Sequence, residues 1–195
     1  MRRFIVIGHR ATTSGSFKLD DLCGSTGRLD VLLRCINSAF FLSHDIRRDV
    51  EMFLVLLGPP SPPKTLRLVG NELKYLNPDE RSTGALVRNA LMQKVTGEER
   101  CSPGIYISNR SYPELFSNIS KETKVVYLKE DGADIRAVDF SGDVTFVLGD
   151  DQDLTSEEEE ALLVYQPDRV RLGPISYHAD HCLTIVNNEL DRRVI

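Results

Sequence analysis

The chain has 195 residues, of which 41% are hydrophobic and 27% are charged. This composition is typical of one globular fold or two small domains, and it excludes collagen-like, low-complexity and disordered chains. The longest apolar run is six residues, 52–57, far short of the ~18–20 that a membrane-spanning helix needs. No signal-peptide core follows Met1, so we expect a cytoplasmic protein with no membrane partner.

The net charge of −5 is unevenly distributed. Residues 1–50 contain eight Lys or Arg and five Asp, a net charge of +3, so the remaining chain carries −8. Much of that negative charge lies in 149–160, which holds seven carboxylates and no basic residue. A basic first part is typical of a protein that binds an anionic partner there.

The order of apolar runs and amphipathic stretches predicts an α/β fold with a largely parallel sheet. For example, Leu29, Leu32, Leu33 and Ile36 repeat at helical spacing, and Thr155 opens an acidic first turn. The predicted helices are 28–41, 82–95, 111–119, 155–165 and 181–190. The predicted strands are 4–8, 51–57, 104–108, 124–128, 144–148 and 169–172, with a hairpin of 65–69 and 72–76 around Gly70-Asn71.

Three predicted strands end in short polar loops, after Leu128, Leu148 and Leu172. In two of these loops a glycine follows at once, at Gly149 and Gly173. Ligands of parallel α/β sheets sit at the carboxyl ends of strands, where glycine lets a flat ring approach the backbone. The alternative is that these glycines serve turn geometry alone.

The common nucleotide motifs are missing: the chain has neither GxGxxG nor GxxxxGK[ST]. The acidic run 149–160 would repel a polyphosphate but tolerate a neutral or cationic ligand, such as a sulfonium cofactor. A solvated acidic helix start explains the same run without any ligand.

The four cysteines form no CxxC pair, which excludes zinc-ribbon and thioredoxin-type motifs. His178 and His181 have metal-pair spacing, but no third ligand is near in sequence, so we expect no metal. Cys182 begins the last predicted helix and is interpreted as a pocket wall rather than a nucleophile.

Residues 9–28 form a long polar stretch without apolar periodicity, which is typical of functional loops. Arg10, Lys18 and Arg28 are candidate phosphate contacts, and Asp20 or Asp21 is a candidate proton acceptor. A solvated loop whose charges pair with one another is the alternative.

Three segments resemble the archaeal TrmY family of SPOUT-superfamily tRNA methyltransferases. They are FIVIGHRATTSGSFKLDDLCGSTGRLDVLLRC near the start, FVLGDD, and VRLGPISYHADHCLTIVNNELDRR near the end. The resemblance implies S-adenosylmethionine-dependent methylation of N1 of pseudouridine 54 in the T-loop of tRNA. It also implies a SPOUT-type fold and a homodimer that shares its active site.

The resemblance further implies a single domain with two halves: a Rossmann-like, RNA-facing half over about 1–120 and a knotted, cofactor-binding half over about 121–195. The trefoil knot cannot be derived from periodicity, because threaded chains are rare. The cofactor pocket is expected to use Leu128, Gly149, Leu172, Gly173, Pro174, Ile175, Ser176, Tyr177 and Cys182.

The catalytic candidates are three carboxylates, Asp20, Asp21 and Asp30, with Arg28 stabilising charge on the base. Arg10, Lys18 and Arg28 are the expected RNA contacts, facing the T-arm. Two other functions stay open at this point. One is methylation of another atom, such as a ribose 2′-hydroxyl, and the other is an RNA-binding module that has lost the cofactor.

Overall fold

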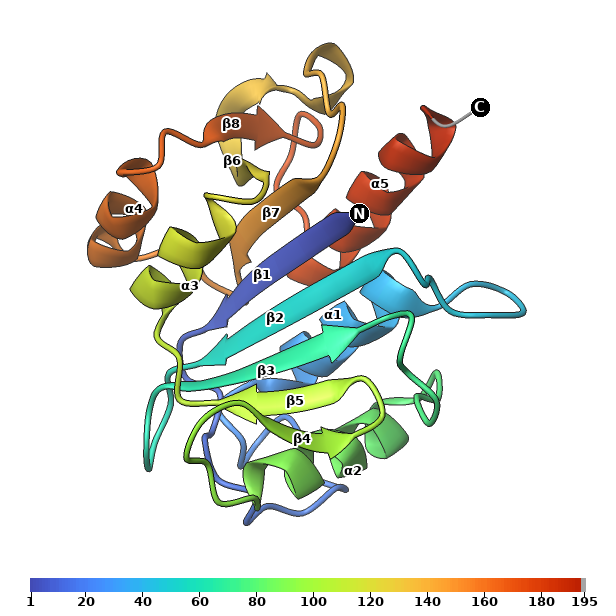
Figure 1. Cartoon of the computed structure of the whole chain (residues 1–195), viewed down its shortest axis with the longest axis vertical. Coiled ribbons are helices and arrows are strands. Elements are labelled where there is room, and N and C mark those ends of the chain that lie inside the picture. Colours follow the sequence, from blue (N-terminus) through green and yellow to red (C-terminus); the bar gives the residue numbers. More distant parts are fainter. Residues whose placement is uncertain (194–195) are drawn as a thin grey trace.

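The computed structural model describes residues 1–193, which form one eight-stranded mixed sheet flanked by helices (Figure 1). The strand order across the sheet is β4-β5-β3-β2-β1-β7-β6-β8. The strands are β1 (Arg2–Gly8), β2 (Val50–Leu56), β3 (Lys64–Val69), β4 (Glu99–Ser102), β5 (Ile105–Ser108), β6 (Lys124–Asp134), β7 (Val144–Gly149) and β8 (Asp168–Arg171).

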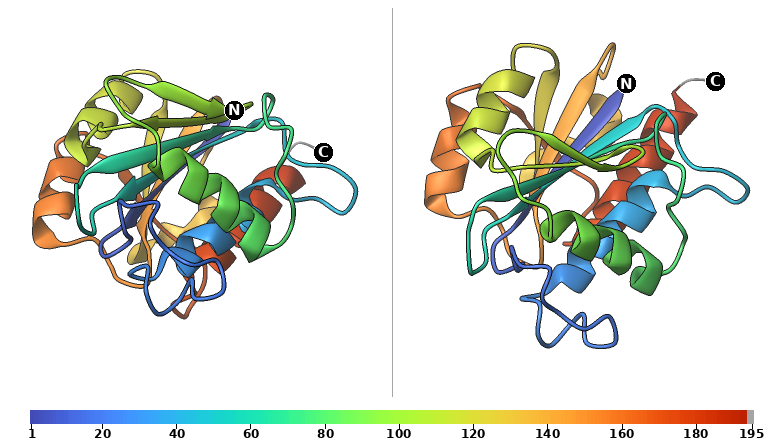
Figure 2. Two further views of the ribbon diagram at one scale, coloured as in Figure 1. Left: turned by 90° about the horizontal axis from the view of Figure 1, so that it is seen from below. Right: turned by 60° about the horizontal axis from the view of Figure 1, so that its bottom comes forward.

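Helices cover both faces of the sheet (Figure 2). They are α1 (Leu29–Phe40), α2 (Glu80–Leu91), α3 (Tyr112–Ile119), α4 (Ser156–Leu163) and α5 (Ala179–Arg192), with a short 3-10 turn at Ile135–Ala137. Successive residues of β1 point to opposite faces, so Phe4 and Val6 join the core under α1, α2 and α5. Ile5 and Ile7 join a second core under α3 and α4. No helix within the described chain is both long and apolar enough to cross a bilayer.

The parallel part of the sheet runs from β2 to β8. β1 pairs in parallel with β2 on one side and with β7 on the other, and β6 pairs in parallel with both β7 and β8. The carboxyl ends of these five strands therefore meet at one edge of the sheet. β3, β5 and β4 extend the sheet by antiparallel pairing.

The prediction that residues 72–76 form the second strand of a hairpin is wrong. After Gly70 the chain turns, with the backbone N–H groups of Glu72 and Leu73 donating to the Val69 carbonyl. Leu73 then enters the core at 2% exposure. Strand β5 pairs with β3 in place of residues 72–76. Ile105 and Ile107 of β5 bury apolar surface there, whereas 72–76 offers mainly polar side chains.

The strand predicted to end at Leu128 continues to Asp134. Its pairing with β8 shifts register between Leu128 and Ala133, so the polar residues 129–132 bulge from the ladder. The predicted polar loop is therefore real, but it is a bulge within β6 rather than the end of the strand.

A polar cluster under the start of β1 holds α5 in place. The Arg2 guanidinium is buried and donates to the Asn187 side chain (3.1 Å) and to Asp191 (2.9 Å). The Asn187 amide in turn donates to the carbonyls of Ser38 and Ala39 at the end of α1. These bonds tie α5 to both β1 and α1, and so determine where the first turn of α5 lies.

Candidate functional site

A cavity of about 600 Å³ opens at the carboxyl edge of the parallel strands. Its walls come from the bulged part of β6, the loops after β7 and β8, the first half of α1 and the first turn of α5. A smaller cavity of about 50 Å³ adjoins it and shares five of its wall residues, so the two form one site. The shared residues are Leu128, Glu130, Ser176, Tyr177 and Cys182.

Eight of the nine residues expected to bind a cofactor line this site. Gly149 lines the larger cavity, while Leu172, Gly173 and Ile175 line the smaller one. Only Pro174 is absent from both walls. The structure thus brings together three loops that lie far apart in the sequence.

A glycine allows the turn after β7 to fold tightly. A Cβ atom on Gly149 would collide with the backbone carbonyl oxygen of Gln152, so this turn closes only on a glycine. A Cβ atom on Gly173 would lie 2.7 Å from the hydroxyl oxygen of Tyr177, at the end of a side chain that can move aside. Gly149 therefore has a steric role in shaping the cavity wall.

The larger cavity has both apolar and acidic lining residues. Leu128, Leu148 and Cys182 give it apolar surface, and Glu130, Asp151, Asp153 and Asp180 contribute carboxylates. Asp150 also borders the cavity, but its carboxylate is buried against His9. Such a lining suits a ligand with a flat apolar part and a cationic part.

Arg28 contributes the cationic side of the cavity, where α1 begins. Its guanidinium forms two hydrogen bonds with Asp30, at 3.1 and 3.2 Å, and lies 3.6 Å from Asp151. Asp30 is 4% exposed and also bonds Arg34 at 3.0 Å. Burial raises the pKa of Asp30, but the two guanidiniums outweigh burial and hold that pKa below its usual range. Asp30 is thus a positioning carboxylate for Arg28.

The other predicted residues of the amino-terminal loop are dispersed. Asp20 and Asp21 are exposed and lie outside the cavity wall, and Asp21 accepts from the Gly24 backbone N–H. Arg10 pairs with Asp151 at 2.8 Å, whereas Lys18 lines a separate groove. Of the predicted catalytic and RNA-binding residues, the structure therefore brings only Arg28, Asp30 and Arg10 to the cavity region.

His9, which the sequence analysis did not single out, links the loops beneath this site. Its Nδ1 lies 2.8 Å from Asp150 and its Nε2 lies 2.9 Å from Glu158 on α4. Hydrogen bonds with these two buried carboxylates raise the pKa of His9 to about 10. The side chain is therefore an imidazolium that ties the loop after β1 to the loop after β7 and to α4.

Asp151 was also missed as an individual residue. In the sequence it is one of seven carboxylates in the acidic run 149–160, but in the structure it lies between Arg10 and Arg28. The position of a carboxylate two residues past a strand-ending glycine is a signal that could have identified it.

Cys182 is a wall residue rather than a reactive thiol. Burial, together with Glu130 and Asp180, raises its pKa to about 11, so the thiol is neutral near pH 7. His178 and His181 stack edge to face, with ring centroids 5.6 Å apart. Within residues 1–193, no three His, Cys, Asp or Glu side chains converge as metal ligands would.

Comparison with known proteins identifies the family. A family model described as "Putative SAM-dependent RNA methyltransferase" matches residues 1–195. A protein of Methanocella arvoryzae is 51% identical over 99% of this chain and 100% of its own length. One of Haloferax volcanii is 47% identical over 98% and 96%. Both carry the name tRNA (pseudouridine(54)-N(1))-methyltransferase. The chain belongs to this family.

The fold agrees with a solved structure of another protein. Archaeoglobus fulgidus Nep1, bound to S-adenosylhomocysteine, superposes with a TM-score of 0.69 at 15% identity, over 99% of both chains. At that identity the similarity concerns the fold alone.

The residues of the cavity fit S-adenosylmethionine, the cofactor of this family. Its adenine ring is flat and apolar on both faces, and Leu128, Ile175 and Cys182 offer apolar walls beside the close-turning backbone at Gly173. Its sulfonium and ammonium groups are cationic, which matches the carboxylates of the larger cavity.

Replacing Gly149 with Ala is expected to weaken S-adenosylhomocysteine binding at least tenfold, because the added Cβ forces the turn after β7 to open. Titration calorimetry measures this affinity. Gly97→Ala is the matched control, since nothing lies within 4 Å of its added Cβ. Equal affinities in the two variants would separate this loop from cofactor binding.

His9→Gln is expected to remove a pH-dependent part of the stability. The pKa of His9 in the folded protein, about 10, exceeds the ordinary value of 6.5. The charged imidazole therefore contributes its full stabilisation of the folded state below pH 6.5, and this contribution is lost as the pH rises to about 10. Each pKa unit corresponds to roughly 1.4 kcal/mol. Urea unfolding of the wild type between pH 6.5 and 10 should show this decline, and the variant should lack it.

His44→Gln serves as the control, because His44 is exposed and, within residues 1–193, its ring hydrogen-bonds with Ser43 and with no carboxylate. It should keep the wild-type pH dependence. A decline of the same size in His9→Gln would mean that another group causes it.

Proposed function

We propose that this protein transfers a methyl group from S-adenosylmethionine to N1 of pseudouridine 54 in the T-loop of tRNA. The observation that carries the proposal is full-length identity of 42–51% to relatives named for this reaction. The cavity supports it, because one edge of the sheet holds both a cation-tolerant pocket and a guanidinium. We place the reaction in the cytoplasm.

The cofactor supplies an electrophilic methyl group on a sulfonium. The protein must hold the target base so that N1 faces that group, and must accept the proton that N1 loses. Arg28, held in orientation by Asp30, is proposed to donate to a ring carbonyl and stabilise the negative charge that develops there.

We propose Asp151 as the proton acceptor in place of Asp20 and Asp21. It lines the cavity, its side chain is 23% exposed, and it lies beside Arg28. Asp30 is buried and accepts three guanidinium hydrogen bonds, two from Arg28 and one from Arg34, which leaves it less free to take up a proton than Asp151, which accepts one, from Arg10.

The decisive experiment supplies purified protein and S-adenosylmethionine with a T-arm RNA that carries uridine or pseudouridine at the target, followed by nucleoside mass spectrometry. Methylation of pseudouridine alone is expected, because uridine has no free N1–H. Methylation of both RNAs would move the acceptor to the ribose or another shared atom. No methylation of either RNA, despite cofactor binding, would favour a silent RNA-binding module.

Asp151→Asn is expected to lower kcat by ~100-fold or more, the usual contribution of a general base. Asp20→Asn and Asp21→Asn are matched controls, since both residues are exposed outside the cavity, and they should retain near wild-type rates. A large loss of kcat in Asp20→Asn or Asp21→Asn, with near wild-type kcat in Asp151→Asn, would make Asp20 or Asp21 the candidate base. Asp30→Asn should instead weaken RNA binding and catalysis together, because it releases Arg28.

We further propose the two-part organisation, with residues of about 1–120 facing RNA and about 121–195 binding the cofactor through a trefoil knot. It is supported by the cavity, whose walls come largely from the bulge of β6, the loops after β7 and β8 and the start of α5. A homodimer is part of this proposal. Exposed apolar residues support it: Leu163 and Val164 at the end of α4, and Ile175 and Tyr177 in the loop after β8.

Val164→Lys is expected to weaken the dimer, because Val164 is 72% exposed and a charge there would be buried in the interface. Analytical ultracentrifugation should show twice the chain mass for the wild type and a shift towards one chain for the variant. Met92→Lys, at the similarly exposed Met92, is the control. A wild type of single-chain mass would refute the dimer.

A further inference from the structure

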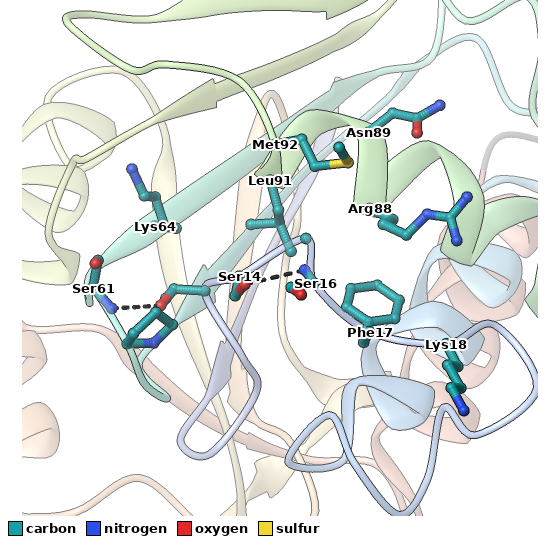
Figure 3. Close-up of a pocket in the computed structure, with 13 residues that line it drawn as sticks. Ser14, Ser16, Phe17, Lys18, Ser61, Lys64, Arg88, Asn89, Leu91 and Met92 are labelled. Atoms are coloured by element: carbon teal, nitrogen blue, oxygen red, sulfur yellow. Dashed lines mark hydrogen bonds between the residues drawn. The ribbon is translucent and has the colours of Figure 1, made fainter.

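A second groove, of about 970 Å³, lies beside the cofactor cavity and has a different character (Figure 3). It runs between the loop 13–18, the proline-rich segment 60–64 and the last turn of α2. Figure 3 shows Lys64 on one side of the groove, with Lys18 and Arg88 on the other. The methyl-transfer step proposed above uses none of its lining residues.

Hydrogen bonds and a close backbone approach fix the walls of the groove. The Thr13 hydroxyl donates to the Gly58 carbonyl (3.0 Å) and accepts from the Ser61 backbone N–H (2.8 Å). On the opposite side, a Cβ atom on Gly15 would lie 2.7 Å from the Arg88 carbonyl oxygen, so the loop rests directly on α2. The groove is therefore built by the fold.

The groove is cationic although the protein carries a net charge of −5. Lys18, Lys64 and Arg88 line it, and no carboxylate does among the residues described. Within residues 1–193, none of the three cations has a carboxylate within 4.0 Å, and Lys64 donates only to the amide oxygen of Asn109 (2.6 Å). By contrast, Arg10 and Arg28 are ion-paired. The charge of the groove is thus available to an anion.

Apolar side chains lie between these cations. Phe17 is half-buried, and Met92 is 70% exposed at the end of α2. Figure 3 shows the Phe17 ring between Ser16 and Lys18 and the Met92 thioether above Leu91. An aromatic ring and a thioether next to cations can hold a stacked base while the cations hold its phosphates.

The groove and the cofactor cavity share one structural element. The loop that follows β1 supplies Lys18 to the groove and, ten residues later, ends at Arg28 in the cavity. The other groove wall follows β2, which is the parallel neighbour of β1. Both sites therefore open at the same edge of the sheet.

We propose that this groove binds an unpaired stretch of the substrate RNA that flanks the methylated nucleotide. Lys18, Lys64 and Arg88 contact its phosphates, and one base stacks on Phe17 and Met92. The inference rests on the proposed function for the identity of the RNA. An unpaired strand fits because a base within a duplex has no free face to stack on a side chain.

The first test measures the binding of fluorescently labelled T-arm RNA by anisotropy at several salt concentrations. Each of Lys18→Gln, Lys64→Gln and Arg88→Gln should reduce the slope of log affinity against log salt by about 0.7, the value for one phosphate contact on a single strand. Lys121→Gln is the control, because Lys121 is exposed and lies outside the groove. Wild-type slopes in all three groove variants would overturn the proposal.

The second test concerns the stacked base. Met92→Ala should weaken RNA binding about tenfold with little effect on folding, since Met92 is largely exposed. An unlabelled single strand of the loop sequence should compete at least tenfold better than a duplex of the same sequence. Equal competition by the two RNAs would show that the groove also binds a duplex, and would refute the proposal that it binds an unpaired strand.

Two readouts separate this inference from the proposed function. Affinity for S-adenosylhomocysteine should be unchanged in every groove variant, which shows that each variant is folded. If the groove variants lose RNA affinity while the methyl group is found on an atom other than N1, RNA binding by the groove is supported and the proposed function is refuted. If N1 is methylated and the groove variants bind RNA normally, the proposed function is supported and RNA binding by the groove is refuted.

Discussion

The position of β1 between two parallel neighbours is the constraint on which the rest of the structure depends. Its register sets Gly8 against Leu56 of β2, and Ile7 against Gly149 of β7. All three strands therefore end at the same edge, and the loops that follow them begin side by side. A one-residue shift of β1 would exchange the side chains of Phe4 and Ile5 between the two cores and separate these loops.

His9 turns that geometric proximity into a bonded assembly. It is the first residue after β1, and its imidazolium lies between Asp150, after β7, and Glu158, on α4. Burial raises the pKa of Glu158, but its bonds with His9 and Thr155 outweigh burial and keep that pKa below its usual range. The loop that contains Gly149 and Asp151 is thus held by charge-assisted bonds from below, while its other side faces the cavity.

The edge of the sheet divides into two electrostatic regions. The cavity proposed for the cofactor is lined by carboxylates from the bulge of β6 and the loop after β7, and the groove is lined by Lys18, Lys64 and Arg88. Arg28 lies at the cavity and belongs to the same loop as Lys18. A net charge of −5 therefore does not argue against an RNA substrate, because binding depends on the local distribution of charge.

The sequence by itself predicted the helices, most of the strands and the three polar segments that line the proposed cofactor cavity, since apolar periodicity and strand-ending glycines are local properties of the chain. It did not determine the neighbour of β3, because the choice between 72–76 and β5 depends on which segment buries more apolar surface. Nor did it separate Asp20 and Asp21 from Asp151, or reveal His9. Residues 9 and 150 meet only when β1 pairs with β7, and contacts of that separation belong to the tertiary structure alone.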